Sequence, residues 1–214
     1  MKKYTLPVIN QQIETVILAN GEFPTHPITL SILENSKYLV CCDGAINNLS
    51  HTNKIPDAIV GDCDSLSKEN QLRFSNIIHR ISEQDTNDLT KAVHFCIEQS
   101  RKKITILGAT GKREDHTIGN ISLLCEYMKC GDVEMITDYG VFVGIETNSA
   151  FESSLKQQVS LFSIDRCKVT THNLLYPVTN HEFTNWWQAT LNEATDKEFC
   201  IETNGRMIIY RAFL

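Results

Sequence analysis

Short, uninterrupted apolar runs recur through the first two thirds of the chain. The clearest are residues 15–18 (TVIL), 38–42 (YLVCC), 57–60 (DAIV) and 104–107 (ITIL). A strand that is apolar on both faces is typical of a parallel sheet whose two faces are covered by helices. These runs therefore predict the strands of an open, mostly parallel α/β sheet.

Helical periodicity lies between these runs. Residues 28–33 predict one or two helical turns. An apolar stripe at i, i+3, i+4, i+7 and i+8 predicts a helix over 89–97, with capping-type residues before it at 85–88. A second stripe runs through Ile118, Ile121, Leu124, Cys125 and Met128, after an acidic start at 114–115. Alternation of strands and helices supports an α/β fold with flanking helices.

The pattern changes after about residue 145. Short β-type segments follow at 159–164, 168–171, 199–203 and 207–210. Asn204-Gly205 stands between the last two and predicts a hairpin with a type I′ turn, in which both central residues need a positive φ. We expect two domains, an α/β domain at 1–145 and a small all-β domain at 146–214. The second is below the size that folds comfortably alone and should pack on a partner surface.

Composition narrows the class of protein. The 214 residues include 20 basic and 26 acidic side chains, for a net charge of −6, which argues against a broad nucleic-acid-binding face. No apolar run approaches the roughly 18 residues of a membrane span, and the start, MKKYTLPVIN, has no long apolar core of a signal peptide. Eight cysteines without a C-x-x-C pair favour buried free thiols in a reducing compartment. We therefore expect a cytoplasmic protein that contacts neither nucleic acid nor membrane.

Aspartates follow the predicted strands. They are Asp43, the pair Asp62 and Asp64, the turn residues Asp85 and Asp88, and Asp115. Ligands of open α/β sheets bind beyond the carboxyl ends of the strands, so parallel neighbours would bring these acids to one rim.

Such a group of carboxylates repels itself unless a cation lies between its members, and Mg²⁺ prefers carboxylate oxygens. Any single aspartate is better explained as a turn or N-cap residue than as a metal ligand. For Asp62 and Asp64 together we favour metal binding, because D-x-D on an extended segment directs both side chains to one side.

The loop from Gly108 to His116, GATGKREDH, is the second candidate element. Glycines between a strand and a helix offer backbone N–H groups to a phosphate, and Lys112 and Arg113 add positive charge. The loop matches neither the Walker loop nor the dinucleotide fingerprint. Taken alone, it fits an ordinary turn between a strand and a helix as well as it fits a phosphate-binding loop. Beside an acidic group it favours nucleotide and magnesium chemistry. His116 lies in the loop and could touch the ligand, whereas the other histidines show no ligand spacing.

The motifs together resemble the thiamine pyrophosphokinase family. They are Asp43-Gly44-Ala45, PDAIVGDCDS at 56–65, QDTNDLTK at 84–91, GATGKREDHTIGN at 108–120, and Thr190 to Glu193 with the hairpin around Gly205. Their order and spacing match as well, so the resemblance covers most of the chain.

The resemblance implies a nucleotide-binding α/β domain, a C-terminal β-sandwich, and a homodimer with active sites between subunits. It implies transfer of pyrophosphate from ATP to the hydroxyl of thiamine, which yields thiamine diphosphate and AMP. Its catalytic acids would be Asp43, Asp62, Asp64, Asp88 and Asp115, of which Asp62, Asp64 and Asp88 would hold Mg²⁺. The implied ATP-binding residues are Gly44, Gln84, Gly108, Thr110, Gly111, Arg113 and His116. Asn192 and Trp187 are the thiamine-binding candidates.

Three positions depart from the family pattern. Ala45 replaces a second glycine, Asn87 replaces a threonine but still suits a helix cap, and Leu191 replaces a serine that could contact thiamine. Trp187 is favoured over Trp186 for stacking on the thiazolium, although both indoles could instead be local core. The alternatives to a pyrophosphokinase are a non-catalytic nucleotide-binding regulator and a metal-dependent phosphate-ester hydrolase.

Overall fold

The computed structural model describes residues 1–49 and 52–213. These residues form two compact units. One, the α/β unit, is Val8–Asp138, and the other, the β unit, combines Met1–Pro7 with Tyr139–Leu214. None of the described helices is long and apolar enough to cross a membrane.

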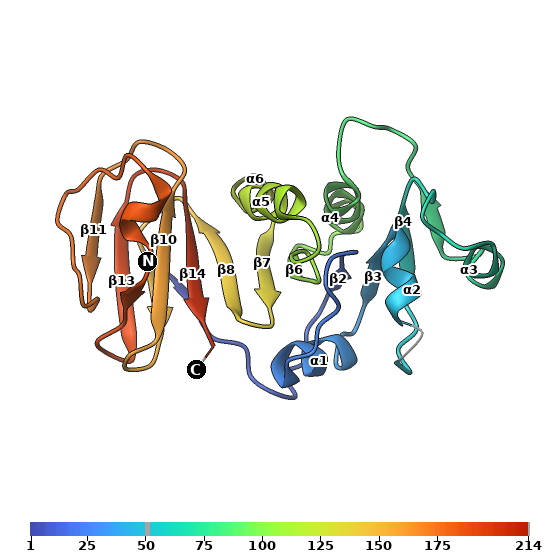
Figure 1. Ribbon diagram of the computed structural model, residues 1–214, viewed down its shortest axis with the longest axis horizontal. Helices are drawn as coiled ribbons and strands as arrows, with labels where there is room; N and C mark the ends of the chain where they lie inside the picture. The colour runs from blue at the N-terminus through green and yellow to red at the C-terminus, as the bar shows by residue number, and fades with distance from the viewer. Residues whose placement is uncertain (50–51, 214) are drawn as a thin grey trace. The chain divides into compact units, whose positions relative to one another are not determined.

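The α/β unit is built on six parallel strands in the order β7-β6-β2-β3-β4-β5 (Figure 1). The strands are β2 (Val16–Leu18), β3 (Leu39–Cys42), β4 (Ala58–Gly61), β5 (Ile78–Arg80), β6 (Lys103–Leu107) and β7 (Asp132–Thr137). The four apolar runs correspond to β2, β3, β4 and β6, and their residues are buried apart from Lys103. The prediction of an open parallel sheet with flanking helices is confirmed.

Helices flank this sheet on both sides. They are α1 (Pro27–Glu34), α2 (Ile46–Leu49), α3 (Lys68–Arg73), α4 (Asp88–Glu98), α5 (Glu114–Ser122) and α6 (Leu124–Tyr127), with a short 3₁₀ helix η1 (Asp43–Ala45) after β3. Figure 1 shows α1 on the opposite side of the strands from α4, α5 and α6. The predicted stripe of α4 packs on β2, β3 and β4. Asn87 caps this helix, accepting a hydrogen bond from the Thr90 N–H at 2.9 Å.

The second predicted stripe does not form one buried helix. The chain breaks at Leu123 into α5 and α6. Leu124 and Cys125 are buried where α6 packs on β7, but α5 has no buried residue and Ile118 is 57% exposed. Periodicity identified Leu124 and Cys125 as buried correctly, but not Ile118. It could not show that only the second half of the stripe meets the sheet.

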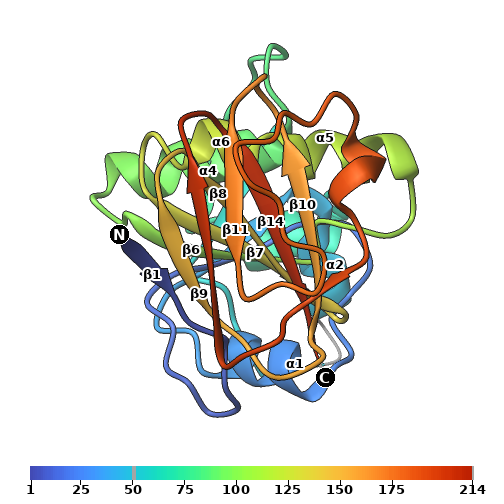
Figure 2. The same cartoon turned by 90° about the vertical axis from the view of Figure 1, so that its left-hand side faces the viewer.

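The β unit is a sandwich of two four-stranded sheets (Figure 2). One sheet has the order β1-β9-β13-β11, and the other, fully antiparallel, has β12-β10-β14-β8. The strands are β1 (Lys2–Tyr4), β8 (Gly140–Ile145), β9 (Ser149–Glu152), β10 (Gln158–Ser163), β11 (Val169–His172), β12 (Asn192–Glu193), β13 (Glu198–Thr203) and β14 (Met207–Ala212). The rings of Phe151 and Phe199 stack at 4.9 Å within its core. The predicted C-terminal sandwich is therefore present.

The division between the units differs from the expected one at 145/146. It falls between 138 and 139, because β8 pairs with β14 along its whole length. The first seven residues also join the β unit, since β1 pairs in parallel with β9. Arg211 anchors this segment: its buried guanidinium donates to the carbonyls of Tyr4, Thr5 and Glu152. The pairing of the chain start with a strand 145 or more residues later leaves no local pattern in the sequence.

The predicted type I′ hairpin at Asn204-Gly205 is wrong. The two flanking strands, β13 and β14, belong to different sheets and do not pair with each other. Neither turn residue has a positive φ. Gly205 is required by close approach instead, because a Cβ there would lie 2.6 Å from the Cβ of Cys167. A turn that crosses between two layers uses the same residue types as a hairpin, so composition alone does not separate them.

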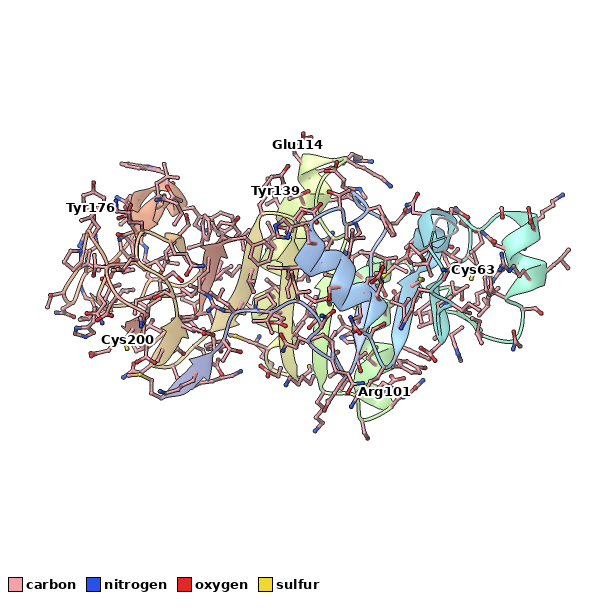
Figure 3. The ribbon with its side chains drawn as sticks, turned by 90° about the horizontal axis from the view of Figure 1, so that it is seen from below. Cys63, Arg101, Glu114, Tyr139, Tyr176 and Cys200 are labelled. Atoms are coloured by element: carbon pink, nitrogen blue, oxygen red, sulfur yellow. The ribbon has the colours of Figure 1, made fainter. Side chains whose placement is uncertain are left out.

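All eight cysteines are free within the described chain. Six are buried, including Cys63, while Cys200 is half-buried and Cys130 is exposed. Cys63 and Cys200 are labelled in Figure 3. Burial raises the pKa of the Cys96 thiol to about 12 and the pKa of Cys63 as well, so these groups behave as small apolar side chains.

Candidate functional site

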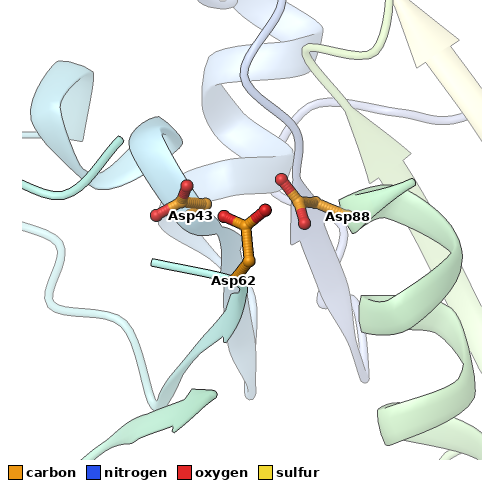
Figure 4. A group of neighbouring side chains, drawn as sticks. All are labelled: Asp43, Asp62 and Asp88. Carbon is orange, nitrogen blue, oxygen red and sulfur yellow. The ribbon is translucent and has the colours of Figure 1, made fainter. Parts of the chain in front are cut away.

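Three aspartates meet at the carboxyl ends of neighbouring strands. Asp43 follows β3, Asp62 follows β4, and Asp88 begins α4. Strands β3 and β4 are paired in parallel, so their ends lie at the same edge of the sheet. One carboxylate oxygen from each residue lies within 4.8 Å of the others (Figure 4). We call these three residues the aspartate group.

Gly61 allows this convergence. A Cβ at this position would lie 2.8 Å from the Cβ of Asp43 and 3.2 Å from Oδ1 of Asp88. Because such contacts are closer than side chains tolerate, any other residue would push the aspartates apart. The last residue of β4 is thus a structural requirement for the aspartate group.

Asp43 is the buried member of the group. Its Oδ2 accepts a hydrogen bond from the Ser65 N–H at 3.0 Å, whereas its buried Oδ1 accepts none from the residues that the structure describes. Burial, together with the charge of Asp88, raises the pKa of Asp43. A hard cation fits this environment, because the buried oxygen receives no hydrogen bond and two further carboxylates lie beside it.

Asp62 has the opposite electrostatic environment. Its Oδ1 accepts from the Asp64 N–H at 3.1 Å and its Oδ2 from the Gln84 amide at 3.4 Å. These hydrogen bonds lower the pKa of Asp62, so its carboxylate stays ionised. Gln84, predicted as a nucleotide-binding residue, is therefore held against the aspartate group.

Asp64 does not belong to the group. The expected extended D-x-D geometry is wrong, because Cys63 adopts a left-handed conformation with φ of 70° and the segment turns. The turn is closed by the Asp64 N–H on Asp62, and the Asp64 side chain is exposed. Asp43 takes the third position that the sequence assigned to Asp64. The role of Asp64 as a metal ligand stays a prediction.

Asp115 also lies outside the group, in an exposed ion pair. The Arg113 Nε donates to its Oδ1 at 3.1 Å and Nη2 to its Oδ2 at 2.5 Å. This bidentate contact lowers the pKa of Asp115 to about 2, so the acid remains charged at any ordinary pH. Asp115 orients Arg113 in this structure rather than adding a carboxylate to the aspartate group.

The loop after β6 has the backbone expected of a glycine-rich turn. Gly108 and Gly111 both have left-handed φ values, of +64° and +76°. The loop is fixed to the segment after β2, where the Gly21 N–H donates to the Gly108 carbonyl at 2.7 Å and the Glu22 N–H to the Thr110 carbonyl at 2.8 Å. Lys112 is tied to the same segment through the Asn20 carbonyl at 3.0 Å.

Two members of the aspartate group, Asp62 and Asp88, and residues of this loop line one cavity of about 420 Å³. Among the predicted residues, its walls contain Asp62, Gln84, Asp88, Gly111, Arg113 and His116. The predicted catalytic and ATP-binding residues outside the lining are Asp43, Gly44, Asp64, Gly108, Thr110 and Asp115. Gly44 is buried behind it, where a Cβ would lie 2.7 Å from the Asn20 side-chain nitrogen.

The cavity has further walls that the sequence did not indicate. Asn20, Gly21, Lys91 and Asn120 line it. Asn120 joins the two halves of the site, since it donates to the Ala109 carbonyl at 2.8 Å and accepts from the Asn87 amide at 3.1 Å. Lys91 is the last residue of the motif QDTNDLTK, and Asn120 is the last residue of GATGKREDHTIGN. Their place in these motifs is the one signal that could have identified them.

The thiamine-binding candidates lie in the β unit and have different environments. Asn192 is buried, and its side chain accepts from the Tyr176 N–H at 3.1 Å and donates to the Tyr176 carbonyl at 2.9 Å. Trp187 is 70% exposed. Trp186 is 42% exposed, with its indole N–H bonded to the Ser163 carbonyl at 3.1 Å and its ring edge against Phe162. Trp187 is therefore not local core, and Asn192 uses its amide to hold the chain around Tyr176.

The chain matches two family models. Residues 29–136 match "Thiamin pyrophosphokinase, catalytic domain", and residues 140–210 match "Thiamin pyrophosphokinase, substrate-binding domain". Curated relatives include thiamin pyrophosphokinase 1 of Caenorhabditis elegans, 31% identical over 46% of this chain and 44% of that protein. Another is thiamine pyrophosphokinase 1 of Oryza sativa subsp. japonica, 36% identical over 44% of this chain and 39% of that protein. The matched segments thus span less than half of these relatives.

Solved structures share the fold over the whole chain. Thiamin pyrophosphokinase from Candida albicans has a TM-score of 0.84 at 19% identity, covering 100% of this chain and 93% of that one. Thiamine pyrophosphokinase from Bacillus subtilis has a TM-score of 0.76 at 22% identity, covering 93% and 99%.

Proposed function

This chain belongs to the thiamin pyrophosphokinase family, and on that premise we propose that it transfers a pyrophosphoryl group from ATP to the hydroxyl of thiamine. The products are thiamine diphosphate and AMP. The observation that carries the proposal is one cavity lined both by Asp62 and Asp88 of the aspartate group and by Gly111, Lys112 and Arg113 of the loop. Carboxylates on one wall and cations with glycine backbone on the other suit a magnesium-dependent reaction on a polyphosphate.

Asp43, Asp62 and Asp88 would hold Mg²⁺. The donor set is carboxylate oxygen alone, and the buried Oδ1 of Asp43 lacks a donor among the described residues, so the group fits a hard divalent cation. When bound, Mg²⁺ neutralises phosphate charge and polarises the phosphoryl group under attack. Asp64 is the further ligand that the family motif suggests.

The loop wall would hold the phosphates of ATP. Gly111 offers backbone without a side chain, and Arg113 offers a guanidinium that Asp115 keeps in place. Gln84, His116 and Gly44 complete the proposed nucleotide-binding set, with Gly108 and Thr110 supporting the loop through their carbonyls.

The chemistry itself is a displacement at the β-phosphorus of ATP. The thiamine hydroxyl oxygen forms the new bond, and the bond between the β-phosphorus and the bridging oxygen of AMP breaks. An aspartate of the site accepts or orients the hydroxyl proton. Positioning and charge neutralisation by these residues supply most of the acceleration.

The nucleotide product tests this function. The protein is incubated with ATP, Mg²⁺ and thiamine, and we expect AMP to form only when thiamine is present. Phosphate or ADP released without thiamine would instead support a hydrolase or an ordinary kinase. ATP binding without any product would support a non-catalytic regulator.

Thiamine recognition gives a second prediction. Trp187→Ala should raise the thiamine KM about tenfold and leave the ATP KM unchanged, because an exposed indole is free to stack on the cationic thiazolium. Its melting temperature should change little. Trp186→Ala is the matched control: it loses a hydrogen bond and an edge contact with Phe162, so it should mainly lower the melting temperature. Two destabilised variants with an unchanged thiamine KM would rule out stacking.

We also propose a homodimer with active sites between the subunits. Large apolar side chains are exposed on the β unit, namely Leu175, Tyr176, Trp187 and Leu191; Tyr176 is labelled in Figure 3. A protein interface in the assembled dimer would bury side chains of this kind. Light scattering should give about twice the chain mass of 24.3 kDa at micromolar concentration. A fully active monomer would refute the assembly.

The free thiols support a reducing, cytoplasmic location.

A further inference from the structure

Lys91 is a buried cation beside the aspartate group. Its side chain is 3% exposed, although it contributes to the wall of the cavity. Its Nζ lies 3.3 Å from Oδ1 of Asp88, one turn earlier on α4. Lysine is almost never buried this deeply unless its charge is compensated, so the position calls for a specific partner.

The charges at this edge of the sheet favour a role beyond one ion pair. The three carboxylates and the Lys91 ammonium together leave two negative charges, which equals the charge of a single divalent cation.

A purely structural role predicts different behaviour. A lysine that only completes the packing of α4 would affect the stability of the helix and leave the affinity for metal unchanged. A lysine that offsets one carboxylate charge must instead weaken cation binding, because like charges repel more strongly where solvent is excluded.

We propose that Lys91 is a positioning residue that holds Asp88 and offsets one charge of the aspartate group, so that the group takes one divalent cation per chain. This inference rests on the proposed metal-binding role of Asp43, Asp62 and Asp88. It does not depend on which substrate receives the pyrophosphate. Lys91 thereby sets how tightly the cation is held before nucleotide arrives.

Mn²⁺ binding to the full chain without nucleotide tests the proposal, by isothermal titration calorimetry. Wild type should bind one Mn²⁺ per chain. Lys91→Met should bind Mn²⁺ about tenfold more tightly or better, because it removes a positive charge at similar volume. Lys91→Arg, which keeps the charge, should rescue the wild-type affinity. Lys129→Met is the control, because Lys129 also pairs with an acid at i−3, Glu126, but does so at the exposed surface.

The outcomes separate cleanly. Unchanged or weaker Mn²⁺ binding in Lys91→Met, with Lys129→Met at the wild-type value, would overturn the proposal. Binding of two Mn²⁺ ions per wild-type chain, or of none, would also overturn the proposal. This second measurement uses the wild-type protein and therefore does not depend on whether a variant folds. AMP formation by wild type is measured separately. Its absence alongside the expected Mn²⁺ affinities would refute the pyrophosphokinase function and leave the role of Lys91 intact.

Discussion

Asp62→Asn is expected to lower kcat by about 1000-fold or more. The substitution removes one negative charge from the aspartate group at nearly constant volume, so the group loses much of its affinity for a cation. The amide oxygen of asparagine can still accept the Asp64 N–H, and the melting temperature should stay within a few degrees of wild type. AMP formation at saturating ATP and thiamine, measured across a Mg²⁺ titration, gives both the rate and the metal dependence.

Asp43 and Asp64 provide the internal comparison. The geometry predicts that Asp43→Asn behaves like Asp62→Asn, because Asp43 belongs to the aspartate group and Asp64 is outside it. The family motif predicts the same loss for Asp64→Asn. Measuring the three variants together decides which aspartate is the third ligand. Near-normal turnover of Asp62→Asn at limiting Mg²⁺ would remove the metal assignment altogether.

Arg113→Ala is expected to lower kcat/KM for ATP by about 100-fold. Its guanidinium lies on the cavity wall and can bind phosphate oxygens bidentately, a contact that alanine removes. The KM for thiamine should remain unchanged. Because the side chain is exposed and paired only with Asp115 among the described residues, the folded state should lose little stability.

Two variants sharpen this expectation. Arg113→Lys keeps the charge without the planar fork, so its kcat/KM for ATP should fall between alanine and wild type. Asp115→Asn leaves Arg113 in place but weakens its orientation, so the loss should be smaller than that of Arg113→Ala. If Asp115→Asn lowers kcat as much as Asp62→Asn does, Asp115 acts in the chemical step and its assignment as an orienting residue is wrong.

The parallel sheet could be predicted because its strands are buried on both faces. Residues 39–42, 58–61 and 104–107 carry continuous apolar runs, and a glycine or an aspartate directly follows or ends each run. Strand character and strand end are both local properties. The order of the residues was therefore enough to expect acids at one rim and a glycine loop beside them.

Membership of the aspartate group was less predictable. Sequence spacing favoured Asp64, but a left-handed residue at Cys63 turns the chain and takes Asp64 away. Asp43, which comes from the neighbouring strand, occupies the third position instead. Backbone conformation at one residue decided this, and a cysteine with positive φ is not signalled by its type.

The walls supplied by distant segments depended wholly on tertiary structure. Asn20 and Gly21 reach the cavity because β2 lies beside β6 in the sheet, which brings the ends of both strands together. Lys91 is the last residue of the motif at 84–91, but only the packing of α4 on the sheet buries its ammonium against Asp88. The charge balance of the site could not be counted before that burial was known.

In the β unit, too, the sequence determined some features and the tertiary structure decided others. Short β-type segments predicted its C-terminal strands, in which buried residues alternate with less buried ones. The fold alone decided how these strands divide between two sheets and where the turn at Asn204-Gly205 crosses between them. It also decided that the first seven residues return to β9. The sequence by itself determined which segments are strands, which residues carry charge and which chemistry they suit. Which of them meet was decided by contacts between distant segments, because such contacts depend on the packing of the whole chain and leave no periodic signal along it.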